Sequence, residues 1–265
     1  MKTVLSKQDQ YLRQQIRNKR VITMMRIIIF VSFFILWETA ARFGWIDDFI
    51  FSSPTRVVQT LAEMIADRTF FGHLSITLIE TIVSFLLVIG CTLAVTILLW
   101  LNEGISKTLE PYLVILNSLP KSALAPLLIV WLGANYRTII VTGMSVAIFG
   151  SILSLYTNFM EVEQDKIKLI RTLGGNRKDI LFKVMIPANI PNILSLMKVD
   201  IGLCLVGVII GEFIASRQGL GYLIIYGSQV FKLDWVLMSI LVLCVIAMAL
   251  YGVISVIQKI YLKKI

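Results

Sequence analysis

The stretch IRTLGGNRKDILFKVMIPANIP, residues 170–191, decides the fold of this chain. It is basic and contains turn-forming residues, yet it lies between two segments that are apolar enough to sit in lipid. Gly174 and Gly175 predict the end of one helix in a sharp turn, because glycine accepts positive φ at little cost. Asn176 is a suitable N-cap for a second helix, and Pro187 marks the return of the chain to the membrane.

The residues before the two glycines predict the first helix of this loop. In EVEQDKIKLIRTLGG the apolar side chains recur at Ile167, at Leu169 or Ile170, and at Leu173, which places them on one helix face. We therefore expect residues 160–187 to form a helix, a glycine turn and another helix. A rigid, basic and partly apolar protrusion of this kind suits docking in a groove of another protein. A solvated basic connector is the alternative that the periodicity leaves open.

The composition indicates a membrane protein. Of the 265 residues, 57% are hydrophobic and 15% are charged, and the mean hydropathy is +0.85. A soluble domain carries about 25% charged residues. The net charge of +9 does not indicate nucleic-acid binding, because the positive residues flank apolar runs and so report on topology. The sequence predicts an all-α polytopic membrane protein with one membrane domain.

Six segments are long and apolar enough to cross a bilayer, which takes about twenty apolar residues per helix. The third of them is interrupted by LPKSALAP, which predicts a broken helix. A Ser53-Pro54 pair between the first two predicts the start of a short amphipathic helix. The predicted spans are Val21–Phe43, Ser75–Leu101, Leu109–Leu132, Thr138–Phe159, Asn189–Ala215 and Trp235–Ile257.

The distribution of Lys and Arg predicts the orientation of these spans. With the N-terminus inside, seventeen of them lie on the inner side and six on the outer side. This favours a multi-pass protein with both termini in the cytoplasm, and it puts the 160–187 loop in the cytoplasm. Residues 1–20 form a basic leader, which is either a helix along the inner membrane surface or a frayed tail. We expect the first apolar run to be a retained helix and not a cleaved signal peptide.

Three motifs in order resemble one known family. The 170–191 stretch is similar to the coupling motif of the permease subunits of bacterial ABC importers, with the motif's glycine at Gly174 and its closing proline at Pro187. SLPKSALAPLLIVWLG (118–133) and GEFIASRQGLGYLI (211–224) resemble segments of the sulfonate, taurine and nitrate branch of these permeases. The chain departs from the motif at three positions, since Lys168 replaces a usual Glu and the next two residues replace alanines.

The resemblance implies a fold for this chain, and it implies that separate partner subunits supply ATP hydrolysis and solute capture. Residues 21–265 would be a type I importer permease domain in the bacterial cell membrane, working as a homodimer surrounded by lipid. A pair of ATPase subunits would hold ATP and Mg, and an extracytoplasmic solute-binding protein would deliver a small solute. This chain would not be an enzyme and would bind no cofactor or metal itself. The coupling residues that it implies are Lys168, Arg171, Thr172, Leu173, Gly174, Gly175, Asn176 and Arg177.

Several polar and small residues inside the predicted spans are candidates for a translocation pathway or gate. Ionisable groups in a span are costly and usually face a cavity or a partner. Lys198 and Asp200 are two residues apart, so they point to different helix faces. Gly207 and Gly211 permit a close helix approach, either at a dimer axis or pathway or within one subunit. The full candidate set is Asn117, Ser118, Pro120, Lys121, Lys198, Asp200, Gly207, Gly211 and Glu212.

Two other classes of membrane protein fit the sequence less well. A secondary transporter driven by an ion gradient often shows paired interrupted helices, and only one interrupted segment is present here. A membrane enzyme needs a catalytic constellation, and no metal cluster, nucleophile with its base, or pair of catalytic carboxylates stands out. The sequence also lacks the G-x-x-x-x-G-K-[ST] phosphate loop, so ATP hydrolysis is expected on a separate subunit. The solute is expected to be a sulfonate-like anion, taurine, a nitrate-like anion, or a vitamin or its precursor.

Overall fold

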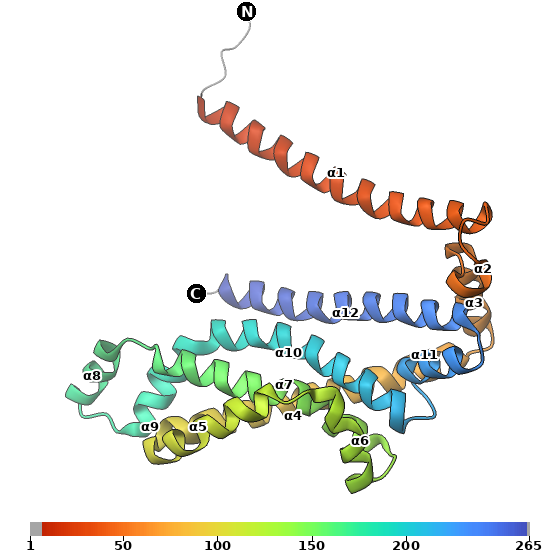
Figure 1. The fold of residues 1–265 in the computed structure, drawn as a ribbon. Helices are drawn as coiled ribbons and strands as arrows, with labels where there is room; N and C mark the ends of the chain where they lie inside the picture. Colours follow the sequence, from red (N-terminus) through yellow and green to blue (C-terminus); the bar gives the residue numbers. More distant parts are fainter. Residues whose placement is uncertain (1–6, 264–265) are drawn as a thin grey trace, which may run out of the picture. The chain divides into compact units, whose positions relative to one another are not determined.

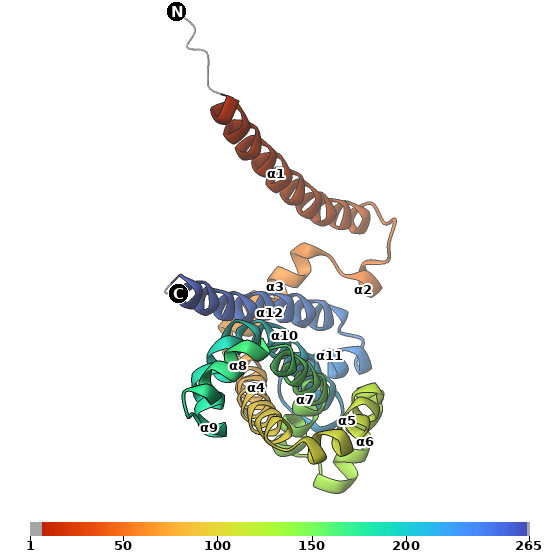
Figure 2. The same cartoon turned by 90° about the vertical axis from the view of Figure 1, so that its left-hand side faces the viewer.

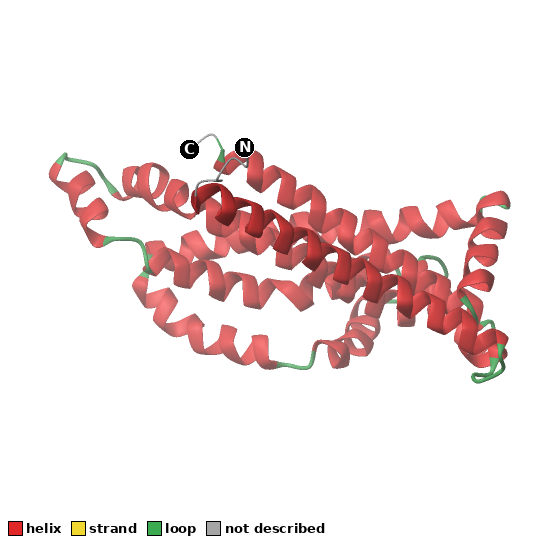
Figure 3. Cartoon of the chain, turned by 90° about the horizontal axis from the view of Figure 1, so that it is seen from above, coloured by secondary structure: helices red, strands yellow, loops and turns green. Residues whose placement is uncertain are grey.

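The computed structural model describes residues 7–263, and within that range the chain is helical with no strand (Figure 3). This confirms the all-α prediction. The chain divides into two units, residues 1–62 and 63–265, and each is described by itself. The helices are α1 (Lys7–Arg42), α2 (Asp48–Phe51), α3 (Pro54–Ala66), α4 (Thr69–Leu101), α5 (Glu103–Ser118), α6 (Lys121–Leu132), α7 (Tyr136–Met160), α8 (Gln164–Thr172), α9 (Arg177–Ile180), a π-helical turn (Leu181–Met185), α10 (Ile186–Ala215), α11 (Leu220–Gln229) and α12 (Leu233–Leu262).

The number of membrane spans agrees with the prediction of about six. Five helical segments of the described residues are long and apolar enough to cross a membrane: 20–42, 69–101, 136–160, 177–215 and 233–262. The helices α5 and α6 together pass the same test but are bent by 99° at Leu119 and Pro120. The third predicted span is therefore a broken helix, as the prolines indicated. Pro120 is the N-cap of α6 and has no N–H with which to continue the ladder from α5.

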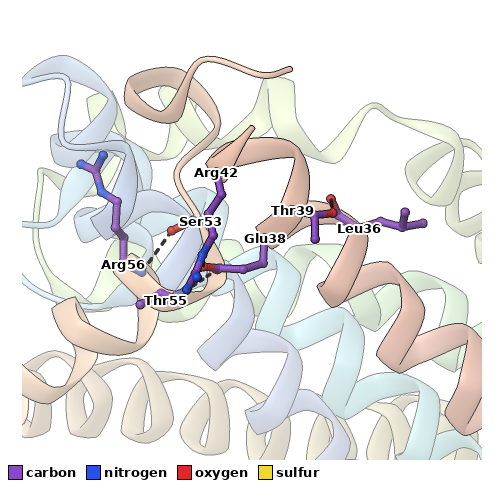
Figure 4. Close-up of polar contacts among 7 residues, drawn as sticks. All are labelled: Leu36, Glu38, Thr39, Arg42, Ser53, Thr55 and Arg56. Carbon is purple, nitrogen blue, oxygen red and sulfur yellow. Dashed lines mark hydrogen bonds and ion pairs between the residues drawn. The ribbon is translucent and has the colours of Figure 1, made fainter. Parts of the chain in front are cut away.

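The first unit contains α1 and α2 and the start of α3, joined by a polar network around Glu38 (Figure 4). The Glu38 carboxylate accepts hydrogen bonds from the backbone N–H of Thr55 (3.1 Å), from the Thr55 hydroxyl (2.8 Å) and from Arg42 Nε (2.7 Å). It thus lies at the N-terminus of α3, where the free N–H groups and the helix dipole favour an anion. Pro54 is the first residue of α3, as the Ser53-Pro54 pair predicted.

The predicted leader continues directly into the first span. α1 is one helix from Lys7 to Arg42, so from Lys7 onward the basic segment is helical. Residues 1–6 of the predicted 1–20 leader lie outside the described residues. The prediction that the basic leader lies along the inner membrane surface stays untested.

The second unit is a bundle in which α7 and α10 lie at the centre with α4 and α12 alongside (Figures 1 and 2). Its core is formed by apolar side chains from all four helices: Phe85, Val88, Ala147, Ile201, Cys204 and Ile254. At one end of the bundle α8 and α9 project beyond the long helices, and α12 ends there too (Figure 1). We call this the α8 end. The opposite end, where α11 lies, is the α11 end.

The contact between α7 and α10 depends on glycine. A Cβ at Gly207 would lie 2.8 Å from the Cα of Gly143 and 2.9 Å from the carbonyl oxygen of Thr142. The backbones of the two helices therefore touch at this point, which a larger residue would prevent. Gly211 likewise packs against Ile139 of α7. The structure thus places Gly207 and Gly211 in packing within the chain, one of the two alternatives that the sequence left open.

Replacing Gly207 with alanine is expected to destabilise the bundle. The added methyl group has to push α7 away from α10, and such overpacking costs about 1–3 kcal/mol. Gly202 is the matched control, because it lies in the same helix and a Cβ there meets nothing within 4 Å. The melting temperature of each purified variant checks this: Gly207→Ala should lower it, and Gly202→Ala should leave it unchanged or raise it. Equal melting temperatures in the two variants would contradict the proposed contact.

Candidate functional site

The turn between α8 and α9 is a helix C-cap that needs glycine at one position. Gly174 has φ of +79°, in the left-handed region. Its N–H donates to the carbonyl of Arg171 (3.0 Å), and the Gly175 N–H donates to the carbonyl of Ile170 (2.9 Å). This pair of bonds is the Schellman motif, which satisfies the last carbonyls of a helix. The predicted glycine turn is therefore confirmed, and its geometry fixes the direction in which the chain leaves α8.

The second helix of the loop begins at a capping box. The Asn176 side chain accepts hydrogen bonds from the N–H groups of Lys178 (2.8 Å) and Asp179 (3.0 Å), and the Asp179 carboxylate accepts from the Asn176 N–H (3.0 Å). Asn176 is thus the N-cap that was predicted. The predicted start of the fifth span at Asn189 is wrong, because one continuous helical segment runs from Arg177 through the π-helical turn to Ala215. The π-helical turn lies just before Pro187. Its wider backbone accommodates Pro187, which has no N–H to donate to the helical hydrogen-bond ladder.

The loop is anchored on the ends of the long helices. Ile167 of α8 and Ile180 of α9 are buried against Leu155 and Phe159 of α7. The Arg177 guanidinium adds a hydrogen bond of 2.8 Å to the carbonyl of Leu101, the last residue of α4. Buried apolar contacts on one face and this bond on the other hold the loop as an extension of the bundle. It is not a solvated connector.

The tip of the loop exposes apolar side chains. Leu173 is 75% exposed, Phe182 66% and Leu169 59%. The predicted single apolar face is therefore wrong in part, since Ile167 and Ile170 turn toward the bundle while Leu169 and Leu173 turn away from it. The bundle contacts only one side of α8, so the apolar side chains on that side pack against it and those on the other side stay exposed. We call Leu169, Leu173 and Phe182 the apolar tip.

The remaining predicted coupling residues surround the tip. Lys168 forms an ion pair with Asp165 on its own helix (3.1 Å), and the Thr172 hydroxyl donates to the carbonyl of Leu169 (2.8 Å). Arg171, in the last turn of α8, lines a cavity between the loop and the bundle. All eight predicted coupling residues thus lie in this one protrusion. Their role in docking stays a prediction at this point.

The polar residues of the third span lie at its break. The Lys121 ammonium donates to the carbonyls of Leu116 (3.2 Å) and Asn117, and so caps the C-terminus of α5. A cation is favourable there because it opposes the negative end of the helix dipole. The Ser118 hydroxyl bonds within α5 to the carbonyl of Val114 (2.9 Å). These residues stabilise the bend at Pro120.

Lys198 and Asp200 point in different directions, as their spacing predicted. The Lys198 ammonium lies 5.6 Å from the ring centroid of Tyr251 in α12, a cation–π contact. Asp200 is buried and accepts a hydrogen bond from the Ser151 hydroxyl of α7, while its Oδ2 has no partner among the described residues. Each residue therefore ties α10 to a different neighbouring helix. The structure does not bring the predicted pathway residues together at one site.

At the α11 end, Glu212 is fully buried and organises the connection between α10 and α11. Its carboxylate accepts hydrogen bonds from the Thr77 hydroxyl of α4 (2.6 Å) and from the Gly221 N–H in the first turn of α11 (2.6 Å). The Thr77 oxygen in turn accepts from the Leu220 N–H (2.8 Å). One carboxylate thus joins three helices.

Two further residues of α4 complete this cluster. Glu80, three residues after Thr77 in α4, is also buried, and its carboxyl group lies close to that of Glu212. The second oxygen of Glu80 has no partner within the described chain, and Glu80 lines a cavity of about 590 Å³ at this end of the bundle. His73 accepts a hydrogen bond from the Gly219 N–H (3.0 Å). We call Glu80, Glu212, Thr77 and His73 the α11-end cluster.

Only part of the α11-end cluster was predicted from the sequence. Glu212 was a candidate, and Glu80 was recognisable as an acidic residue within a span. Thr77 and His73 were missed, because Thr is common in apolar segments and the only histidine lies close to a helix start. The available signal is spacing: His73, Thr77 and Glu80 recur at intervals of four and three, on one face of α4.

The comparisons with known proteins agree with this architecture. The family described as "Binding-protein-dependent transport system inner membrane component" matches residues 86–265. A probable ABC transporter permease of Haemophilus influenzae is 29% identical and covers 87% of this chain and 94% of its own length. A putative aliphatic sulfonates transport permease of Bacillus subtilis is 26% identical (88% and 85%), and the formylaminopyrimidine transport permease of Halalkalibacterium halodurans is 23% identical (74% and 77%).

Solved structures show the same fold. The MetNI methionine ABC transporter in an inward-facing conformation matches with a TM-score of 0.64 at 19% identity. The match covers 72% of this chain and 94% of that one. It supports the arrangement of helices and says nothing of the solute.

Removing the Glu212 carboxylate is expected to release the start of α11. Glu212→Ala leaves the Gly221 N–H without its acceptor, and a buried donor of this kind costs about 1–3 kcal/mol. The Thr77 hydroxyl keeps the carbonyl of His73 as an acceptor (3.3 Å). Glu212→Gln keeps one acceptor oxygen and should cost less. Hydrogen exchange at residues 219–221 and the melting temperature check this, with Glu110→Ala on the exposed face of α5 as the control. Unchanged exchange in Glu212→Ala would show that the carboxylate does not hold this segment.

Proposed function

The chain belongs to the family of inner-membrane components of binding-protein-dependent transport systems, and on that basis we propose that it forms the translocation pathway of an ATP-driven importer. As an ABC transporter permease it is not itself an enzyme. ATP and Mg²⁺ are expected on a separate ATPase subunit, which the lack of a phosphate-binding loop in this sequence supports. Two copies of the chain would enclose the pathway.

One observation supports docking of the ATPase subunit on this chain, namely the exposed apolar tip on an anchored loop. Leu169, Leu173 and Phe182 are largely exposed although the loop that carries them is held firmly by Ile167 and Ile180. Exposed apolar side chains on a rigid element are typical of a surface that another protein covers. Because the backbone is already ordered, docking would cost little conformational entropy. We infer that the ATPase subunit covers the apolar tip.

The helix that carries Phe182 of the apolar tip gives the coupling a mechanical basis. From Arg177 to Ala215 the chain is helical without interruption, and this segment ends three residues beyond Glu212. α10 packs backbone to backbone on α7 around Gly207. A displacement of the tip by the ATPase would therefore move α10 as a body, and would reach the α11-end cluster without an intervening loop.

The charge distribution supports a cytoplasmic α8 end. The loop and the C-terminal segment, which lie at the same end of the bundle, are both rich in Lys and Arg (Figure 1). The N-terminal basic segment belongs on the same side by the same rule. The α11 end would then face the extracytoplasmic binding protein that delivers the solute.

The relatives suggest the class of solute without fixing it. One is named for aliphatic sulfonates and another for formylaminopyrimidine, so a small sulfonate-like anion and a vitamin precursor are both compatible with the family. We propose a small polar organic solute of one of these two classes. Thermal-shift screening of the partner binding protein against both classes would identify it.

Replacing Gly174 with valine is expected to uncouple the transporter. A β-branched residue at φ of +79° costs about 1–3 kcal/mol of strain, which the turn would relieve by changing the direction of the tip. Co-purification of the ATPase subunit with the permease should fall about tenfold, and ATP-dependent uptake into proteoliposomes should be lost.

Gly90→Val is the matched control, because Gly90 lies in α4 with ordinary helical φ and a Cβ there meets nothing within 4 Å. It should retain both the association with the ATPase and the uptake. Normal ATPase association together with normal uptake in Gly174→Val would refute the docking role of the turn.

A further inference from the structure

A cavity of about 480 Å³ lies at the α8 end, between the loop and the ends of α4 and α7. Trp100 and Leu101 of α4 and Tyr156 and Met160 of α7 line it from the bundle side. Arg171 and Arg177 line it from the loop side. The two arginines come from different helices and meet here because the Gly174 turn reverses the chain between them.

The cavity carries positive charge that is not neutralised. The Arg171 guanidinium makes no hydrogen bond or ion pair with any residue that the structure describes, whereas the backbone carbonyl of Arg171 is bonded. Arg177 uses one N–H on the carbonyl of Leu101, and its other donors have no partner among the same residues. The acidic residue of the lining, Glu103, lies 3.6 Å from Lys107 and is balanced by it. Two guanidinium groups are thus available to one anion, and guanidinium binds phosphate with two parallel hydrogen bonds.

The position of the cavity along the helices points to the source of the anion. Its lining includes the last residues of two membrane spans, which end at Leu101 and Met160. Trp100 and Tyr156 are the residue types that gather at the boundary between lipid and water. Met160, which lines the cavity, is 55% exposed, so the surface of α7 there is open to acyl chains.

We propose that this cavity binds the phosphate of an anionic phospholipid, with Arg171 and Arg177 as its ligands. Basic pockets at the ends of membrane helices recognise anionic head groups in this way. A zwitterionic phospholipid would fit less well, because its ammonium group would approach the same two arginines. A free phosphate ion would use the arginines but not the apolar span surfaces beside them. Lipid binding at this cavity requires no ATPase and is independent of the docking proposed above.

Native mass spectrometry of the purified, delipidated full chain tests the proposal, with phosphatidylglycerol or phosphatidylcholine added to the detergent solution. The wild-type chain should retain phosphatidylglycerol in preference to phosphatidylcholine. Arg171→Gln and Arg177→Gln should each reduce the retained phosphatidylglycerol about tenfold, the effect of one charge-assisted hydrogen bond. Lys168→Gln is the matched control, since Lys168 lies on the same helix as Arg171 and pairs with Asp165 outside the cavity. It should retain lipid as the wild type does.

The two arginine variants differ in what they disrupt besides the cavity. Arg177→Gln also removes the bond to Leu101, whereas Arg171→Gln breaks no contact of the described chain, so Arg171→Gln tests the site even if the other variant folds poorly. Equal retention in Arg171→Gln and wild type, or an equal loss in Lys168→Gln, would overturn the proposal. Complete displacement of the lipid by millimolar inorganic phosphate would also overturn it, because the site would then be one for a free anion. Failure of ATPase docking would leave these results unchanged.

Discussion

The backbone contact between α7 and α10 at Gly143 and Gly207 is the constraint on which the rest of the bundle depends. Within a bilayer the hydrophobic effect does not drive helices together, so close packing and hydrogen bonds must do so. The small residues bring the two central helices into contact, and the polar side chains of Ser151 and Asp200 then reach across the same interface. α4 and α12 pack on this pair and complete the core.

Because α10 is held in this way, it can connect two distant parts of the protein. At one end it continues without a break through the π-helical turn, which carries Phe182 of the apolar tip, to α9, and at the other end it carries Glu212. Glu212 binds both α4 and the start of α11, so a movement of α10 would disturb two neighbouring helices at once. The proposed coupling thus rests on a rigid helix with a docking surface at one end and a polar cluster at the other.

The parts that could be predicted from sequence are those encoded by local chemistry. The glycine turn, the Asn176 cap and the broken third span each follow from the backbone preferences of one or two residues. The tertiary details were not predictable in the same way. The packing of Ile170 against the bundle and the exposure of Leu173 depend on where the loop meets α7. Thr77 becomes a hydrogen-bond partner of Glu212 only because α4 and α10 are adjacent. A single sequence shows which residues recur on one face of a helix, but it does not show which other element packs against that face.

The most direct test of the account is cross-linking from the tip of the loop. A single cysteine at Leu173, in a chain whose Cys91, Cys204 and Cys244 are replaced, would be joined by a short thiol-to-amine reagent to whatever protein lies against the tip. The account predicts an adduct with the ATPase subunit in inside-out membrane vesicles, with a yield that changes when ATP is added. Labelling of this cysteine by an impermeant reagent applied to intact cells from outside, with no ATPase adduct in any nucleotide state, would contradict it.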